Sequence, residues 1–304
     1  MTAISINEVA PRDGLQMEKR FVPTHEKIAF VDALSDCGFA RIEVTSFTSA
    51  RAIPALADAE IVMREIRRAP GVVYTALVPN VRGMERAIES GVDELNLVMS
   101  CSESHSEANL RRGRAGQLAQ LLEIVREAGH GGVLCNVSLS CAFGCPFEGA
   151  VAPDDVARIA IALMAGGAAG LTLCDTTGMA DPAGLRRLLA RLRGVLPADA
   201  LTIHLHDTRG MALANALAAL DAGATRFDAS CGGLGGCPYA PGASGNVGTE
   251  ALVHMFECMG HATGVDLARL LRVAARVPAL VERPLPNALL AAGTRDQLHP
   301  LPAS

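Results

Sequence analysis

The sequence predicts a (β/α)8 TIM barrel, in which strands and helices alternate and the strands close into a parallel sheet. Short segments rich in Val, Ile and Leu alternate with longer amphipathic segments eight times along the 304 residues. Strict alternation requires parallel strands, because each helix returns the chain to the same edge of the sheet. Polar residues gather where strand after strand ends, and barrel active sites are built at that end. A doubly wound open sheet is the alternative.

The strand candidates are short apolar runs that end in polar or turn residues, which is typical of buried parallel strands. Each is followed by a segment of helical length. We expect strands at 4–11, 40–47, 72–79, 92–100, 132–140, 170–178, 201–207 and 225–233.

The helix candidates carry apolar residues at helical spacing and end in glycine-containing turns. Pro23 and Thr24 open the first and Gly38 follows its end, as helix start and stop signals predict. No linker divides the chain, so we expect one catalytic domain, 1–304, with a C-terminal helical extension at about 265–304. The other helices are expected at 57–71, 80–91, 117–130, 153–167, 182–194, 211–223 and 248–260.

Composition excludes several classes of protein. The net charge is −5 without a basic block, and Trp is absent, so we expect no nucleic-acid partner. No apolar run reaches the ~18 residues of a membrane span. Nine scattered cysteines and no apparent secretory leader predict a cytoplasmic protein with reduced thiols. Cys141 and Cys145 lack a second cysteine pair or a nearby histidine, so we do not expect a structural zinc there.

His204 and His206 occupy alternate positions at the end of the seventh predicted strand. Alternate strand residues point to the same face, with Cα atoms roughly 7 Å apart. Two imidazoles converging from one strand end can clamp a metal ion. The alternative is one core histidine and one surface histidine.

Asp13 and Asn246 also fall at or just beyond predicted strand ends. With the two histidines they form a mixed nitrogen and oxygen set, which suits octahedral Mg²⁺ or Mn²⁺ better than structural zinc. Arg12 adjoins Asp13, and a cation so close to a metal needs a negative group between them. A substrate oxygen that gains charge is such a group, so Arg12 is a candidate electrophilic stabiliser. The alternative is an ion pair that only caps the loop.

Two further carboxylates lie in or at the ends of apolar strands. Glu43, within the second strand, would cost several kcal/mol if buried and ionised without a partner. Asp175 ends the sixth strand. Both are candidates for a general base or for a residue that orients the groups of the site.

A glycine-rich segment, residues 232–246, follows the eighth strand. Six of its fifteen residues are Gly and two are Pro, so it cannot continue a strand or helix. A loop of this length above a barrel mouth predicts a lid whose glycines permit motion. A cysteine in a loop is usually incidental, but Cys237 above a metal site is a candidate acid, base or nucleophile. No P-loop pattern is present.

Together these segments resemble the hydroxymethylglutaryl-CoA (HMG-CoA) lyase family, which belongs to a wider group of metal-dependent barrels that make or break carbon–carbon bonds. The glycine-rich motif is the most specific, because condensing relatives lack it and typically show DGEQ and HND in place of DGLQ and HDT. The motifs are PRDGLQ (11–16), IEVTSF (42–47), SCAFGCP (140–146), CDTTG (174–178), HLHDT (204–208) and GLGGCPYAPGASGN (233–246).

Two positions depart from the family pattern. Met17 stands where the family often has Asn, and Cys174 where Gly is frequent. Neither is an expected metal ligand. Met17 changes the polar surroundings of the first strand's loop, which bears on substrate preference.

The resemblance implies cleavage of 3-hydroxy-3-methylglutaryl-CoA to acetoacetate and acetyl-CoA, with coenzyme A present only as part of the acyl-CoA substrate. It also implies a bacterial-type cytoplasmic enzyme and a homodimer. The alternatives are a lyase for a larger 3-hydroxy-3-alkylglutaryl-CoA, an aldolase or acetyl-CoA condensing enzyme of the same group, and a non-enzymatic CoA-ester-binding barrel.

The expected site residues fall into three groups. The metal ligands are Asp13, His204, His206 and Asn246. The catalytic group contains Arg12 for the enolate oxygen, Cys237 as the acid that protonates the enolate carbon, and Glu43 and Asp175. The substrate-contacting and lid residues are Gln16, Gly235, Gly236, Gly242 and Gly245.

Overall fold

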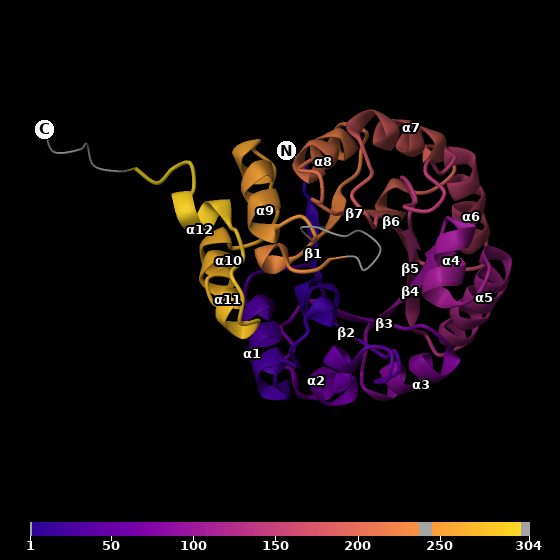
Figure 1. Ribbon diagram of the computed structural model, residues 1–304, viewed down its shortest axis with the longest axis horizontal. Helices are drawn as coiled ribbons and strands as arrows, with labels where there is room; N and C mark the ends of the chain where they lie inside the picture. Colours follow the sequence, from indigo (N-terminus) through magenta and orange to yellow (C-terminus); the bar gives the residue numbers. More distant parts are fainter. Residues whose placement is uncertain (1, 237–244, 299–304) are drawn as a thin grey trace, which may run out of the picture.

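The computed structural model, which describes residues 2–236 and 245–298, contains a closed barrel of eight strands (Figure 1). All eight neighbouring pairs are parallel, and β1 pairs with β8. This closure confirms the barrel and excludes the open sheet. The strands are β1 (Ser5–Glu8), β2 (Arg41–Ser46), β3 (Val73–Leu77), β4 (Glu94–Ser100), β5 (Leu134–Ser140), β6 (Gly170–Asp175), β7 (Leu201–Leu205) and β8 (Arg226–Ala229).

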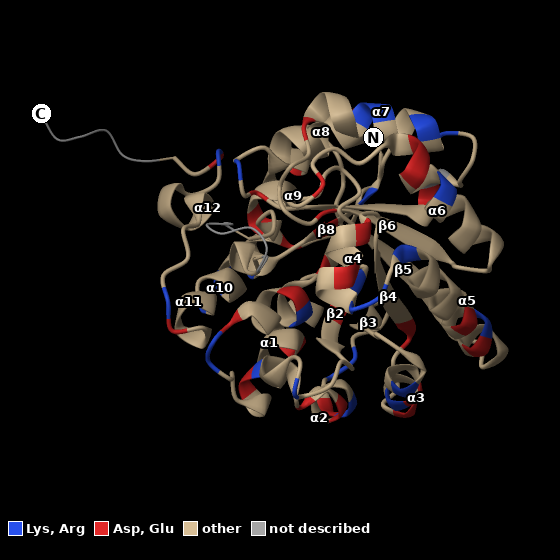
Figure 2. Ribbon diagram, turned by 45° about the vertical axis from the view of Figure 1, so that its right-hand side comes forward, with Lys and Arg blue, Asp and Glu red and all other residues tan. Residues whose placement is uncertain are grey.

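The helices form a ring around the barrel, and both acidic and basic residues occur along them (Figure 2). None of the helices within the described ranges is long and apolar enough to cross a membrane. The described α-helices are α1 (Thr24–Ser35), α2 (Ala59–Glu65), α3 (Val81–Glu89), α4 (Glu103–Leu110), α5 (Arg114–His130), α6 (Pro153–Ala165), α7 (Pro182–Leu192), α8 (Ala212–Asp221), α9 (Thr249–Cys258), α10 (Leu267–Ala274), α11 (Val277–Leu280) and α12 (Ala288–Ala292).

The C-terminal part contains α10, α11 and α12, of which α10 contacts α1 and α9. Five short helical turns complete the described elements: the π-helix η1 (Ala10–Gly14) and the 3-10 turns η2 (Leu15–Met17), η3 (Pro54–Leu56), η4 (Ala198–Ala200) and η5 (Cys231–Gly233).

Several local structures differ from the expected elements. The first strand was expected to reach residue 11, but it ends at Glu8 and the chain then enters η1. The eighth was expected to reach residue 233, but it ends at Ala229 and η5 follows. The helix α4 was not expected, because its sequence ESHSEANL has few apolar residues. Ser102 caps this helix by accepting a hydrogen bond from the His105 amide at 3.1 Å.

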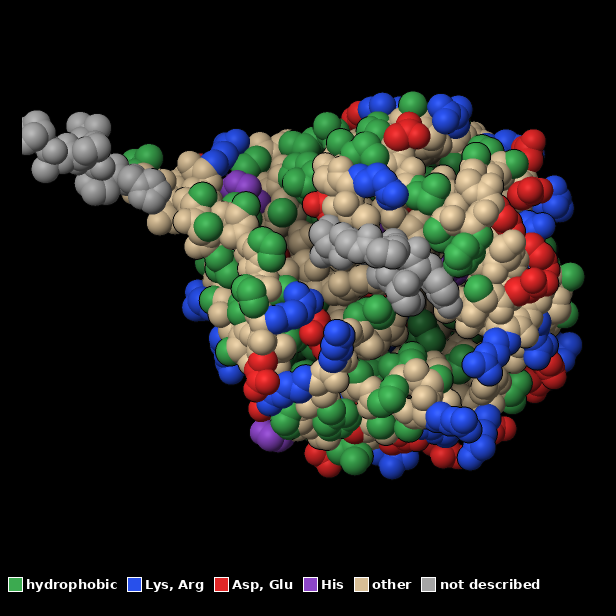
Figure 3. Space-filling model, viewed as in Figure 1, with side chains coloured by type: hydrophobic (Ala, Val, Ile, Leu, Met, Phe, Trp, Pro, Cys, Tyr) green, Lys and Arg blue, Asp and Glu red, His purple; other side chains and the backbone are tan. Residues whose placement is uncertain are grey.

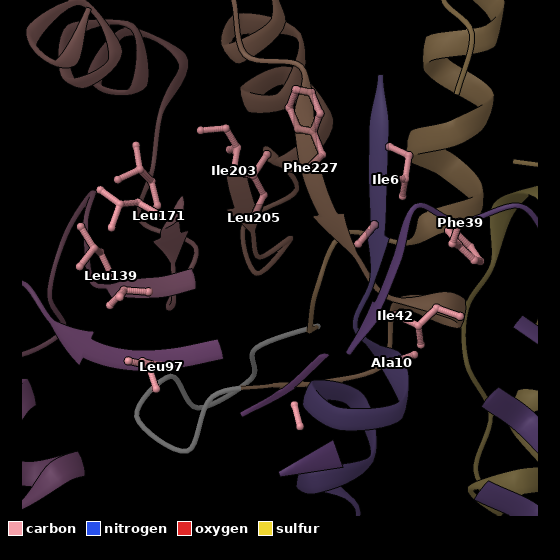
Figure 4. Packing of buried hydrophobic residues seen from close by; sticks show 14 of the residues in the cluster. Ile6, Ala10, Phe39, Ile42, Leu97, Leu139, Leu171, Ile203, Leu205 and Phe227 are labelled. Carbon is pink, nitrogen blue, oxygen red and sulfur yellow. The ribbon is translucent and has the colours of Figure 1, made fainter. Parts of the chain in front are cut away.

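The apolar core lies largely between the strands and the helices. Ile6, Ile42 and Phe227 are fully buried members of this layer (Figure 4). Phe227 also packs against Phe256 of α9, with ring centroids 5.0 Å apart. This layer buries most of the apolar surface that stabilises the barrel.

The inside of the barrel carries polar side chains. Asn96 of β4 donates a hydrogen bond to Glu43 of β2 at 2.7 Å, which spans the intervening strand β3. Asn96 Oδ1 accepts from Asn136 and Ser138 of β5, each at 3.0 Å. Barrel interiors are usually filled by Val, Ile and Leu, so this polar lining sets the present barrel apart.

Candidate metal centre and active site

The π-helix η1 brings Arg12 and Asp13 to the carboxyl-terminal mouth of the barrel. The Val9 carbonyl accepts hydrogen bonds from the amides of Arg12 at 3.1 Å and Asp13 at 2.8 Å. Both side chains are buried, and both line the cavity. Single π-turns of this kind are frequent at functional sites.

Asp13, His204 and His206 form the one group of potential metal ligands found among the described residues. One donor atom from each lies within 4.8 Å of the others. The Nε2 atoms of the two histidines are 3.2 Å apart, and Asp13 Oδ2 lies 3.9 Å from His204 Nε2. Segments distant in sequence thus bring two imidazoles and a carboxylate together.

Asn246 joins this group through its backbone and its side chain. Its backbone forms an antiparallel bridge with His206. Its Nδ2 donates to Asp13 Oδ2 at 2.7 Å and to the Leu234 carbonyl at 2.9 Å. Its Oδ1 is buried and has no hydrogen-bond partner within the described ranges. A buried amide oxygen without a partner is suited to a cation.

The spacing of the two histidine nitrogens is compatible with ligands that share one divalent ion. Two ligand atoms at right angles on an ion with bonds of about 2.1 Å are separated by about 3.0 Å, close to the 3.2 Å between the histidine Nε2 atoms. His204 Nδ1 donates to Asp228 Oδ2 at 3.2 Å. Burial alone would lower the pKa of His204, but Asp228 and Asp13 raise it. In the neutral form of His204 this hydrogen bond places the proton on Nδ1, so that Nε2 is free to bind a cation. A carboxylate behind a histidine is the usual support for a metal ligand.

Electrostatics favours the ligand forms of two of these residues. Burial alone would raise the pKa of Asp13, but the charge of Arg12, with further contributions from the histidines and Asn246, outweighs it and lowers that pKa to about 2. Burial and the neighbouring His204 lower the pKa of His206 to about 4. An ionised carboxylate and a neutral imidazole are the forms that bind a cation.

Arg12 is held in place by two carboxylates. Its Nε donates to Glu43 Oε2 and its Nη1 to Asp13 Oδ1, each at 2.6 Å. Burial alone would lower the pKa of Arg12, but these two carboxylates raise it above its usual value. Glu43 also accepts from Asn96, so both of its oxygens are occupied. Glu43 therefore orients the guanidinium, whose remaining N–H groups are left for another oxygen.

Asp175 shapes the turn after β6. Its Oδ1 accepts from the amides of Met179 at 2.7 Å and Ala180 at 3.0 Å. Its Oδ2 is buried without a hydrogen-bond partner in the described part of the chain. Burial raises the pKa of Asp175 to about 6, so this carboxyl can exchange a proton near neutral pH.

A cavity of about 810 Å³ lies against Arg12, Asp13 and the two histidines, and the face of the molecule in Figure 3 is hollowed at its centre. One part of its lining is formed by Arg12, Asp13, Gln16, His204, His206 and Gly236, and another by Ile53, Asn80, Leu110 and Arg112.

The described ends of the glycine-rich segment contact the ligand group closely. A Cβ at Gly235 would lie 2.4 Å from Asn246 Nδ2, and one at Gly245 would lie 2.5 Å from the Gly233 carbonyl oxygen. Both glycines have positive φ, so a side chain is excluded by conformation as well as by space. Cys237 and Gly242, and with them the centre of the expected lid, lie outside the described residues.

Gln16 and Asp228 complete the group. Gln16 Nε2 donates weakly to Asp13 Oδ1 at 3.4 Å. Asp228, which the sequence reasoning missed, also accepts from Asn7 Nδ2 at 2.9 Å. A signal for Asp228 was present: it is an acidic residue within an apolar strand, the same feature that singled out Glu43.

A family model described as HMGL-like matches residues 3–277. The chain belongs to this family. Its relatives include the hydroxymethylglutaryl-CoA lyase YngG of Bacillus subtilis, which is 44% identical over 93% of this chain and 95% of YngG. The cytoplasmic 3-hydroxy-3-methylglutaryl-CoA lyase of Homo sapiens is 42% identical over 88% of this chain and 72% of the human protein.

Solved structures of HMG-CoA lyases agree with this assignment. An HMG-CoA lyase from Acenitobacter baumannii, in complex with coenzyme A and 3-methylmalate, is 44% identical with a TM-score of 0.95, covering 99% of this chain and 98% of that one. The carboxyl transferase domain of Rhizobium etli pyruvate carboxylase, 19% identical with a TM-score of 0.71, covers 99% of this chain and 50% of that one and shares only the fold. The resemblance found in the sequence is confirmed.

Proposed function

We propose that this protein is a carbon–carbon lyase that cleaves 3-hydroxy-3-methylglutaryl-CoA to acetoacetate and acetyl-CoA with the help of a divalent cation. The observation that carries the proposal is the buried group of Asp13, His204, His206 and Asn246 beside a fixed Arg12. Relatives at 40–44% identity over most of the chain bear the name of this lyase.

Asp13, His204, His206 and Asn246 would hold the cation through a carboxylate oxygen, two imidazole nitrogens and an amide oxygen. The ion would supply Lewis acidity that makes the substrate's C3 hydroxyl acidic enough to ionise near neutral pH. Mg²⁺ and Mn²⁺ both suit this donor set.

Arg12 would stabilise the enolate oxygen that forms as the C2–C3 bond breaks. Its guanidinium is already oriented by Glu43 and Asp13, so little reorganisation is needed when charge develops on the thioester oxygen. Glu43 acts here through Arg12 and is a positioning residue.

Two proton transfers complete the reaction. The hydroxyl proton leaves as the C2–C3 bond breaks, and C2 of the enolate then gains a proton to form acetyl-CoA. Asp175 is the better candidate to accept the first proton, because one of its oxygens lacks a partner among the described residues whereas both Glu43 oxygens are engaged. Cys237, on the segment between Gly236 and Gly245, is the proposed donor of the second.

The decisive experiment is to incubate the purified protein with HMG-CoA and Mg²⁺ or Mn²⁺, with and without a chelator, and to measure acetoacetate and acetyl-CoA. We expect both products in equal amounts only with metal. Absence of acetoacetate with either ion would contradict the proposal. A larger 3-hydroxy-3-alkylglutaryl-CoA, assayed in parallel, tests the wider-pocket alternative, and product formation only with an added 2-oxo acid would favour a condensing enzyme.

Two variants separate the roles within the site. His206→Ala should lose bound metal by elemental analysis, and full occupancy would remove His206 from the ligand set. Cys237→Ser should reduce turnover steeply while it keeps its metal, and a near wild-type rate would refute the acid role. A homodimer and a cytoplasmic location remain predictions, the first testable by light scattering.

A further inference from the structure

Glu8, the last residue of β1, joins three segments of the chain through one carboxyl group. Its side chain is fully buried. Oε1 accepts hydrogen bonds from the amides of Ala10 at 2.8 Å and Cys231 at 2.9 Å, and Oε2 accepts from the Thr249 hydroxyl at 2.8 Å. The partners lie up to 241 positions away in sequence, so this group ties the beginning of the barrel to its end.

Each of the three segments leads to the ligand group. Ala10 begins η1, which carries Asp13. Cys231 begins η5, and the chain continues to Leu234, whose carbonyl accepts from Asn246. Thr249 begins α9 and follows Asn246 by three residues. Glu8 contacts none of the proposed ligands itself, but its partners fix the backbone on both sides of them.

A second buried carboxylate strengthens the same junction. Glu250 Oε1 accepts from the Gly232 amide at 2.8 Å, so Glu8 and Glu250 hold consecutive amides of η5. Burial raises the pKa of Glu8 to about 8, with Glu250 adding to the effect. Oε1 keeps accepting from the two amides in either charge state, so the junction does not depend on ionisation.

The packing around the junction leaves little room for these segments to shift independently. A Cβ added at Gly14 would lie 2.7 Å from Leu234 Cβ, and one at Gly235 would lie 2.4 Å from Asn246 Nδ2. Close-packed contacts transmit displacements. A movement of the η5 segment therefore reaches both Asn246 and the end of η1.

We propose that Glu8 is a positioning residue for the metal site, which sets the separation of Asp13 and Asn246 by holding the starts of η1, η5 and α9 together. The inference rests on the metal-dependent function proposed above.

The test removes one connection at a time. Thr249→Val keeps the shape of the side chain but removes the hydrogen bond that the Thr249 hydroxyl donates to Glu8. This hydrogen bond ties Glu8 to the segment that carries Asn246. Thr263→Val is the matched control, because the Thr263 hydroxyl donates to Glu257 at 3.1 Å beyond the opposite end of α9. Mn²⁺ affinity is measured by titration calorimetry, together with the unfolding midpoint of each variant.

We expect Thr249→Val to weaken Mn²⁺ binding about 10-fold or more, the range typical of losing a group that supports a metal ligand. Thr263→Val should bind Mn²⁺ as the wild type does, even if it unfolds earlier. Glu8→Gln should bind nearly normally, because its amide oxygen still accepts from both backbone amides and its NH2 group can donate to Thr249.

Equal Mn²⁺ affinity in Thr249→Val and Thr263→Val would overturn the inference, because Glu8 would then support only the fold. That result differs from failure of the proposed function, in which the wild-type protein itself would neither bind Mn²⁺ nor cleave HMG-CoA. Glu8→Ala offers a larger perturbation, but the threonine pair decides the question even if Glu8→Ala does not fold.

Discussion

Adjacent residues of β8 show how the two faces of the barrel strands differ. Phe227 packs against Phe256 of α9 in the apolar layer, whereas Asp228 supports His204 inside the barrel. The same division holds on β7, where Ile203 is part of the apolar core and His204 is a proposed ligand.

The comparison teaches that β7 and β8 separate stability from chemistry by strand alternation. The outward face buries apolar surface, which is the main favourable term in folding. The inward face buries carboxylates, amides and histidines, which cost free energy unless each is paired. Substitutions on the outward face should therefore change the free energy of unfolding, whereas substitutions on the inward face should change turnover or metal affinity.

The largest effect is expected on the outward face. Phe227→Ala should lower the free energy of unfolding by about 3–5 kcal/mol, because it leaves a cavity between β8 and α9. Turnover per folded molecule should stay close to that of the wild type. Urea unfolding and an activity assay at low temperature check both statements. An unchanged urea midpoint would contradict the assignment of stability to the outward face.

Arg12→Gln tests the chemistry at the mouth of the barrel, next to the inward-facing histidines. It should lower kcat by about 10²–10³, the range for loss of one donor to a developing oxyanion, with little change in KM. Steady-state kinetics under saturating metal provides the measurement. A large increase in KM with unchanged kcat would make Arg12 a substrate-binding residue.

The pH dependence of the free energy of unfolding should report the ionisation of Glu8. Burial raises its pKa from 4.5 to about 8, so the folded protein binds this proton more tightly than the unfolded chain does. The stabilisation is complete below about pH 4.5 and is lost as pH rises towards 8, with a slope of at most about 1.4 kcal/mol per pH unit.

Glu8→Gln serves as the control for this dependence. Its unfolding free energy, measured by denaturant titration between pH 5 and 8, should fall less steeply with pH than that of the wild type. Parallel curves would show that Glu8 titrates equally in both states. Burial also raises the pKa of Glu250, so a residual slope in Glu8→Gln is expected.

The smallest effect is expected for Ile203→Val. It removes one methylene from the apolar layer and should cost about 0.5–1.5 kcal/mol of stability. Although Ile203 adjoins His204, Mn²⁺ affinity should be unchanged because the two side chains point to opposite faces. A weakened Mn²⁺ affinity would show that the faces are coupled through the strand.

The barrel could be predicted from the sequence because apolar runs and glycine endings repeat along the chain. The ligand candidates could be named because polar residues at strand ends converge in any such barrel. Their connections could not be predicted, since Asn246 and Asp13 are 233 positions apart and meet only through barrel closure. The π-helix η1 and the role of Glu8 also depend on distant contacts.

The ends of the glycine-rich segment are fastened to each other as well as to the barrel. The Ser230 amide donates to the Val247 carbonyl at 3.0 Å, and Asn246 donates to the Leu234 carbonyl. Loop closure costs conformational entropy that grows by only about 0.6 kcal/mol for each doubling of length. Because the closure is made by the ends themselves, a change in the number of residues between Gly236 and Gly245 alters its entropic cost only slightly. Insertions there that keep Cys237 should therefore cost the barrel little stability, as long as Ser230, Leu234, Asn246 and Val247 keep these hydrogen bonds.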